Sequence, residues 1–272
     1  MHYIEGISVV YLRVLCGLGL LALFAAVLPA RAQELTVAAA ADLRPALEEI
    51  ASRFQASSGA PVKLIYGSSG NFYQQIQSGA PFDFFFSANA DYAKKLESAG
   101  LTVPGTYYEY ARGRIVLMVP AGSSLDLKRG LSVLLDPAVK KIAIADPSHA
   151  PYGQAAVSAI KAEKIYDQVS AKLVTGENIS QAASFVLSGA ADAGIVALSL
   201  ALSAGPQVRF AEIPASDYAP IQQACVVLRS SKNQDLAARL ESYIRSDEVA
   251  KIFERFGFEV PASSGRAEKP GP

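Results

Sequence analysis

The chain of 272 residues carries 25 basic and 25 acidic side chains, and its formal net charge is zero. A neutral chain lacks the basic footprint that binds a polyanion, which argues against a nucleic-acid partner. With 51% hydrophobic and only 18% charged residues, the composition is that of a globular protein and excludes a disordered chain. The length suits two modest domains or one large one.

The N-terminal segment has the pattern of a secretory signal peptide. Val14–Leu28 carries no charge and is followed closely by Ala30-Arg-Ala32. A short apolar run that ends in an A-x-A site is typical of signal cleavage, whereas a membrane-spanning helix needs about 20 apolar residues. We therefore predict a signal peptide at residues 1–32, cleaved after Ala32, and an exported mature protein.

Cysteine and histidine usage limits the chemistry of the mature chain. Cys16 lies within the predicted signal peptide, so Cys225 is left alone and cannot form an internal disulfide. Its strand-like surroundings indicate a small buried hydrophobic residue. His149 is the single mature histidine, and no Cys/His cluster indicates a metal site.

Short β-type runs alternate with helical patterns from residue 35 onward. Asp42 is predicted to cap the first helix, which has Pro45 in its first turn, and Gly59 is predicted to end it. This βαβαβα order predicts a mainly parallel sheet covered by helices. The predicted strands are 35–39, 62–66 and 84–86, and the predicted helices are 42–56, 69–78 and 89–100.

Two extended runs, 107–111 and 115–119, are joined by Arg112-Gly-Arg114 and indicate a crossing between two lobes. A second α/β series follows, and the chain returns after Pro214 and Pro220. Its strands are expected at 142–144, 171–175, 193–196, 208–212 and 224–228, and its helices at 154–162, 180–187, 197–203, 234–245 and 247–256. We assign 33–112 and 218–260 to lobe 1, 113–217 to lobe 2, and 261–272 to a disordered tail.

Four strand-to-helix junctions have small, polar or glycine-bearing sequences that suit an anion. A helix N-terminus offers unpaired N–H groups and about half a positive charge, and ligands of open α/β sheets lie beyond the carboxyl ends of strands. Converging on one cleft, these junctions would form an oxyanion cage without lysine or arginine. The junctions are Ala39–Asp42, Tyr66–Asn71, Asp146–Gly153 and Gly176–Ser180.

Each junction also has an ordinary explanation when it is taken singly. Asp42 can be a simple helix cap, and Gly67-Ser-Ser-Gly70 can be a tight turn. This turn lacks the Lys-Ser/Thr that follows in a nucleotide P-loop, so a nucleotide site is not expected.

A periplasmic hydrolase is the alternative class of function. His149 would then have to lie beside an activated serine and a carboxylate, and no G-x-S-x-G elbow is present. His149 lies between Pro147 and Pro151, where a solvated turn residue is expected. The pair Glu48-Glu49 is interpreted as a charged helix face. We therefore expect a binding protein and not an enzyme.

Taken together, the motifs resemble the periplasmic molybdate-binding proteins of ABC importers. The resemblance extends over nearly the whole mature chain, and the order and spacing of seven motifs make it specific. The motifs are Leu35–Leu43, Gly67–Gly70, Gly79–Ala88, Ala145–Gly153, Gly176–Ile179, Ala191–Val196 and Phe253–Phe258.

The resemblance implies an α/β, two-lobed class II periplasmic binding-protein fold with the ligand cleft between the lobes. It implies a monomer without a cofactor that captures molybdate or tungstate through backbone N–H groups and hydroxyls, and delivers the oxyanion to a membrane permease. Carried over by position, the ligand contacts would be Asp42, Ser69 with or without Ser68, Ala88, Tyr152 and Ile179.

Two positions depart from the pattern of the resembled family. Asp42 stands where serine or asparagine often donates a hydrogen bond, and Ala197 stands where a tyrosine hydroxyl often does. A carboxylate donates only when protonated and otherwise repels a dianion. Either Asp42 turns back onto its own helix, or it faces the cleft and selects another anion or a small organic ligand. Tyr152 could supply the hydroxyl that is missing at Ala197.

Overall fold

The computed structural model describes residues 34–261. The predicted signal peptide lies outside these residues, and so does the predicted tail apart from Pro261. Within the described range, no helix combines the length and the apolar character that crossing a membrane requires.

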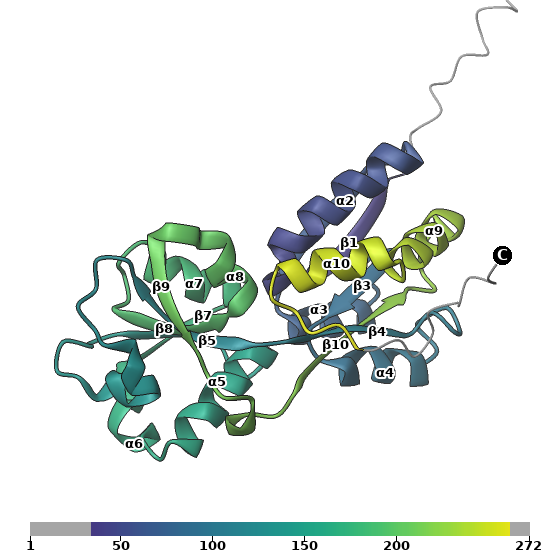
Figure 1. The fold of residues 1–272 in the computed structure, drawn as a ribbon. Helices are drawn as coiled ribbons and strands as arrows, with labels where there is room; N and C mark the ends of the chain where they lie inside the picture. Colours follow the sequence, from purple (N-terminus) through teal and green to yellow (C-terminus); the bar gives the residue numbers. More distant parts are fainter. Residues whose placement is uncertain (1–33, 262–272) are drawn as a thin grey trace, which may run out of the picture. The chain divides into compact units, whose positions relative to one another are not determined.

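The first of two five-stranded sheets has the strand order β2-β1-β3-β10-β4 (Figure 1). In it β1 pairs in parallel with β2 and β3, whereas β10 runs antiparallel to β3 and β4. Its strands are β1 (Leu35–Ala40), β2 (Val62–Gly67), β3 (Phe84–Ser87), β4 (Tyr108–Gly113) and β10 (Ile221–Val227).

Helices cover both faces of this sheet, because successive strand residues point to opposite sides. Two helices pack on the face that carries Ala38, Phe85 and Val226, and three pack on the face that carries Val37 and Phe86. The first pair is α3 (Ser69–Gln77) and α4 (Ala90–Ser98); the other three are α2 (Arg44–Ser58), α9 (Gln234–Ile244) and α10 (Asp247–Arg255), and the short 3-10 helix η1 (Ala41–Leu43) precedes α2.

The second sheet has the order β7-β6-β8-β5-β9 and the same mixture of pairings. Here β6 is parallel to β7 and β8, and β5 is antiparallel to β8 and β9. The strands are β5 (Ile115–Pro120), β6 (Ile142–Ala145), β7 (Leu173–Gly176), β8 (Ala193–Ala197) and β9 (Val208–Glu212). The helices are α5 (Pro151–Ala162), α6 (Tyr166–Val169), α7 (Ile179–Leu187) and α8 (Leu198–Ala204), with 3-10 turns η2 (Leu127–Leu135), η3 (Ser170–Lys172), η4 (Gly205–Gln207) and η5 (Ala215–Asp217).

The predicted two-lobed α/β fold is confirmed, and each predicted strand and helix is present with small shifts at its ends. The sheets are mixed because one strand of each, β10 in the first sheet and β5 in the second, runs antiparallel to both of its neighbours. Helix α5 begins at Pro151, three residues before the predicted start, since proline suits the first turn of a helix.

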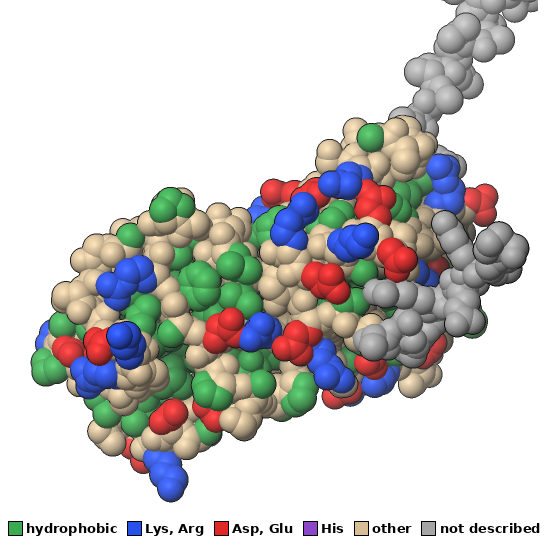
Figure 2. Space-filling model, in the orientation of Figure 1, with side chains coloured by type: hydrophobic (Ala, Val, Ile, Leu, Met, Phe, Trp, Pro, Cys, Tyr) green, Lys and Arg blue, Asp and Glu red, His purple; other side chains and the backbone are tan. Residues whose placement is uncertain are grey.

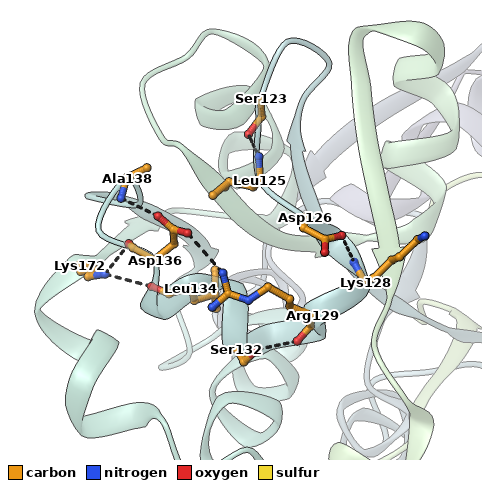
Figure 3. A network of polar contacts seen from close by, with 10 residues as sticks. All are labelled: Ser123, Leu125, Asp126, Lys128, Arg129, Ser132, Leu134, Asp136, Ala138 and Lys172. Atoms are coloured by element: carbon orange, nitrogen blue, oxygen red, sulfur yellow. Dashed lines mark hydrogen bonds and ion pairs between the residues drawn. The ribbon is translucent and has the colours of Figure 1, made fainter.

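The segment η2 was not predicted from the sequence, because contacts distant along the chain fix it. It bends at Gly130, whose φ is 57°. Lys172 Nζ donates to the carbonyl of Leu134 at 3.0 Å, and Arg129 pairs with the Asp136 carboxylate at 3.3 Å (Figure 3). The bond from Lys172 holds the C-terminal end of η2 against the segment that precedes β7, and the Arg129–Asp136 pair is local to η2.

On the face that Figure 2 shows, acidic and basic side chains alternate over α2 and α10. Arg53 lies between Glu49 and Glu248, at 2.9 and 2.7 Å, and Arg255 also pairs with Glu49. The charges of this surface therefore cancel locally. Glu49 belongs to a charged helix face, as expected from the sequence.

Helix α5 lies so close to the end of β6 that only glycine fits at position 153. A Cβ atom there would lie 2.1 Å from the carbonyl oxygen of Ala145. We expect Gly153→Ala to lower the free energy of unfolding by about 3 kcal/mol, because backbone must move to relieve the overlap. Urea denaturation checks this, with Gly122→Ala as the control, since a Cβ at Gly122 meets no atom within 4 Å. Equal stability of the two variants would contradict the prediction.

Candidate functional site

A small cavity of about 10 Å³ lies where strands end and helices begin. All five ligand contacts that the resemblance implies line this cavity, and each of the four predicted junctions contributes lining residues. Its lining residues are Ala40, Ala41, Asp42, Gly67, Ser68, Ser69, Ala88, Ala150, Pro151, Tyr152 and Ile179. A larger cavity of about 310 Å³ shares Ala88 and Pro151 with it. The structure thus brings together residues that are far apart in the sequence.

The prediction that Asp42 caps the first helix is wrong. Asp42 lies within η1, the N-cap residue of α2 is Leu43, and no side chain caps this helix. The carboxyl group of Asp42 bonds instead to side chains from α5 and β10. It therefore faces the cavity, which is the second of the two orientations considered from the sequence.

One carboxyl oxygen of Asp42 accepts two hydrogen bonds, and the other accepts none. Tyr152 Oη and Gln223 Nε2 donate to Oδ2 at 2.9 and 2.6 Å. Tyr110 Oη donates to Gln223 Oε1 at 2.8 Å, which fixes the orientation of the amide. Asp42 has 0% exposure, and its Oδ1 has no partner among the described residues. Oδ1 is therefore the atom left for a ligand.

Burial raises the pKa of Asp42 to about 6, although the hydrogen bonds from Gln223 and Tyr152 oppose the rise. Burial and the neighbouring Asp42 also raise the pKa of Tyr152 well above its ordinary value, so this phenol remains protonated. The described residues that line the cavity include no lysine or arginine. The site consequently offers dipoles and one acid, and no fixed positive charge.

Ser69 and Ile179 supply donors around the cavity, whereas the N–H of Ala88 is used to position Ser69. Ser69 Oγ accepts the N–H of Ala88 at 2.9 Å, which leaves the hydroxyl proton for another acceptor. Ile179 is the first residue of α7, and the Asn178 side chain caps the N–H groups of Ser180 and Gln181. That cap does not use the N–H of Ile179, which is one of the unpaired donors that a helix start presents.

Hydrogen bonds join the elements of the two sheets beside the cavity. Ser68 Oγ donates to the carbonyl of His149 at 2.6 Å, and the N–H of Gly70 donates to the same carbonyl at 3.0 Å. Ser180 Oγ donates to the carbonyl of Ala41 at 2.9 Å. These bonds hold α3 to the loop before α5, and η1 to α7.

His149 is not the solvated turn residue that the sequence suggested. Its Nδ1 lies 2.8 Å from Ser68 Oγ, and its Nε2 lies 3.7 Å from Asp146 Oδ2. A serine, a histidine and an aspartate therefore come together, as the hydrolase alternative requires. Ser68, however, donates its proton to the His149 carbonyl, so the imidazole does not activate this hydroxyl as a nucleophile. The geometry favours a structural contact between the lobes.

Sequence reasoning missed Gln223 and Gly113, which complete the Asp42 network. Gln223 has 0% exposure within the largely apolar strand β10, and a buried amide in such a strand was the available signal. A Cβ at Gly113 would lie 2.0 Å from Tyr152 Oη, so glycine makes room for the phenol. Ala197 is fully buried at the end of β8 and is not among the lining residues.

Comparisons with known proteins identify the family of this chain. A model of the bacterial extracellular solute-binding protein family matches residues 35–259. The chain is 36% identical over 249 residues to the molybdate-binding protein ModA of Azotobacter vinelandii, covering 91% of this chain and 96% of that protein. It is 35% identical to the ModA of Rhodobacter capsulatus, with 85% and 90% covered. The protein belongs to the bacterial extracellular solute-binding protein family.

A solved structure extends the likeness to three dimensions. The periplasmic molybdate-binding protein of Azotobacter vinelandii matches with a TM-score of 0.78 and 33% sequence identity, over 84% of this chain and 99% of that one. Both sheets and their connections therefore correspond to those of a periplasmic binding protein.

We predict that Asp42→Asn stabilises the anion-free protein in a pH-dependent way. Because the pKa is raised from 3.8 to about 6, folding disfavours the ionised carboxylate, by about 3 kcal/mol at full ionisation. This penalty is absent below the unfolded pKa, grows as the pH rises, and is complete above the folded pKa. Asparagine keeps the acceptor for Tyr152 and Gln223 without the charge.

Urea denaturation measures the effect. The gain in free energy of unfolding should be about 0.5 kcal/mol at about pH 4 and close to 3 kcal/mol at about pH 7.5. An equal difference at both pH values would mean that Asp42 does not titrate in the folded protein as described.

Proposed function

We propose that this protein captures molybdate or tungstate in the cavity between its lobes and delivers it to the permease of an ABC importer. One observation carries the proposal: helix starts and hydroxyls from both lobes surround one small cavity that no lysine or arginine of the described residues lines. A slight separation of the lobes would widen this cavity to the size of the anion. The names of the relatives from Azotobacter vinelandii and Rhodobacter capsulatus support the choice of oxyanion.

The mechanism is capture by neutral donors. Ser69 Oγ and the first N–H of α7 at Ile179 would each donate to an anion oxygen, and the other helix starts would add backbone N–H groups. Each hydrogen bond to a charged group contributes about 1.5–3 kcal/mol. About six such bonds give micromolar to nanomolar affinity after the ordering costs of association. Neutral dipoles need no counter-charge when the anion leaves, which suits release to a permease.

The proposed function also includes a location, the periplasm, and a partner, the membrane permease. A mature chain released by signal cleavage after Ala32 would work as a monomer in the periplasm and would need no cofactor. Closure of the two lobes on the anion would present a joint surface to the membrane permease. Molybdate and tungstate are tetrahedral dianions of nearly equal size, so the proposal includes both.

A second candidate is another anion or a small organic ligand in the same cleft. Two observations favour it: the carboxyl group of Asp42 faces the small cavity, and the adjoining larger cavity has polar walls that include Asn89, Gln154 and Gln222. A thermal-shift panel of molybdate, tungstate, sulfate and phosphate separates the candidates. The main proposal requires the largest stabilisation from molybdate or tungstate, and no response to either would exclude it.

Ser69→Ala is expected to weaken molybdate binding by about 1.5–3 kcal/mol, which is about 10- to 150-fold in Kd. The change removes one donor to a buried charge and also leaves the N–H of Ala88 without its acceptor. Isothermal titration calorimetry checks this, with Ser184→Ala as the control, because Ser184 lies exposed on α7 and bonds only along its own helix. Unchanged affinity in Ser69→Ala would remove Ser69 from the site.

Salt should affect molybdate affinity only weakly, by less than about threefold in Kd between about 50 and 500 mM of a non-competing salt. Buried dipoles are screened much less than exposed cationic side chains. Calorimetric titrations across this range provide the measurement. A steep loss of affinity would mean that a basic residue such as Arg44 or Lys63 contacts the anion.

A further inference from the structure

The carboxyl group of Asp42 conflicts with the binding of a dianion. A tetraoxo dianion such as molybdate only accepts hydrogen bonds, and an ionised carboxylate only accepts them as well. Two like charges in one buried cavity repel each other strongly. Because the described lining residues include no cation that could offset this repulsion, one of the two charges must be neutralised.

The hydrogen bonds of Asp42 show where a proton would reside. Oδ2 already accepts from Tyr152 and Gln223, so it has the environment of a carbonyl oxygen. Oδ1 is buried and makes no hydrogen bond within the described chain, although the backbone N–H groups of Asp42 and Leu43 lie near the carboxyl group, so Oδ1 is the oxygen that can carry the proton. Gln223 cannot reverse its amide without losing the bond from Tyr110. The network therefore distinguishes the two oxygens before any ligand arrives.

We propose that Asp42 binds the anion as a neutral carboxylic acid, with Oδ1–H donating to an anion oxygen, so that each captured dianion takes up one proton from solution. This inference rests on the proposed function. No bond other than O–H is made, and the proton returns to solution when the anion leaves. Asp42 thereby becomes a specificity residue that couples oxyanion binding to pH.

The other ionisable groups around Asp42 do not replace it in this role. Tyr152 on α5 and Tyr110 on β4 face it as neutral phenols, and Tyr218, which precedes β10, lies near Tyr152. Burial raises the pKa of each of these tyrosines. The remaining groups near the cavity are turned elsewhere. Arg44 of α2 stacks on Tyr66 and pairs with Glu48, and His149 bonds to Ser68 and approaches Asp146.

The sign of the pH dependence follows from the state of the free protein. With a pKa of about 6, Asp42 is largely ionised above that pH before the anion binds. Binding must then take up a proton, so the Kd for molybdate rises about tenfold for each further pH unit. Well below pH 6 the acid is already protonated, and the Kd no longer changes with pH.

An Asp42 that stays ionised in the complex would give a different dependence of binding on pH. If Asp42 stays ionised, it suits an anion that brings its own proton, such as hydrogen phosphate, whose O–H would donate to Oδ1. Such a ligand would bind without proton uptake at neutral pH. Molybdate and phosphate therefore separate the two arrangements.

Calorimetric titration of molybdate into the mature protein tests the inference. Titrations between about pH 6 and 8.5, in buffers of different ionisation enthalpy, give both the Kd and the number of protons taken up. We expect close to one proton per anion above about pH 7, with Kd rising about tenfold per unit. A flat Kd without proton uptake, or tighter binding of phosphate than of molybdate, would overturn the inference.

The variant Asp42→Asn tests whether Asp42 is the group that takes up the proton. Its carboxamide keeps an acceptor for Tyr152 and Gln223 and places a permanent N–H donor where Oδ1 lies. We expect a Kd that does not change with pH, no proton uptake, and binding about 100-fold tighter than wild type at about pH 8. Retention of the wild-type slope in this variant would exclude Asp42.

Two further variants serve as matched controls. Asp83 is also a buried aspartate, but its carboxylate bonds to Thr36 and Ser231 away from the cavity, and Asp83→Asn should keep the pH slope. His149→Gln should keep the slope as well, whatever its effect on affinity. Loss of the pH slope of Kd in either variant would overturn the assignment to Asp42.

The outcomes also separate this inference from the proposed function. If the wild-type protein binds molybdate with a Kd that does not change with pH, only this inference is excluded. If neither the wild-type protein nor Asp42→Asn binds molybdate, the proposed function is excluded as well.

Discussion

The burial of an anion without a cation is the constraint on which the proposed site depends. In such a site every stabilising interaction must come from dipoles that are already oriented, because the interior cannot reorganise as water does. Parallel pairing of β1 with β2 and β3, and of β6 with β7 and β8, sets the carboxyl ends of these strands at one edge of each sheet. The helix starts that follow are thus gathered where an oxyanion needs donors.

The Asp42 network connects this site to the crossing between the sheets. Tyr152 reaches Asp42 from α5, and Gln223 reaches it from β10, the strand by which the chain returns to the first sheet. Gly113, at the end of β4, leaves the space that the phenol occupies. A change in the charge of Asp42 would therefore act at the place where the two lobes meet.

Much of the fold could be predicted from the sequence, because the order of strands and helices and their apolar periodicity are local properties. Motifs whose spacing resembles a known family predict five ligand contacts, and the structure places these five residues around one cavity. The orientation of Asp42 could not be predicted, since its partners Tyr152 and Gln223 are distant in sequence and a local helix cap was an equally good use of the carboxylate. The Ser68–His149 contact could not be predicted for the same reason. The sequence of a loop between two prolines does not indicate which element packs on it.

Diffraction data collected at the molybdenum absorption edge from crystals grown with molybdate would show directly whether the anion binds in this cavity. One strong anomalous peak is expected in the cavity lined by Asp42, Ser69, Tyr152 and Ile179. Ser69 Oγ and backbone N–H groups should lie at about 3 Å from the anion oxygens, and no lysine or arginine should contact them. A peak in the adjoining larger cavity, or beside a basic side chain, would contradict the account.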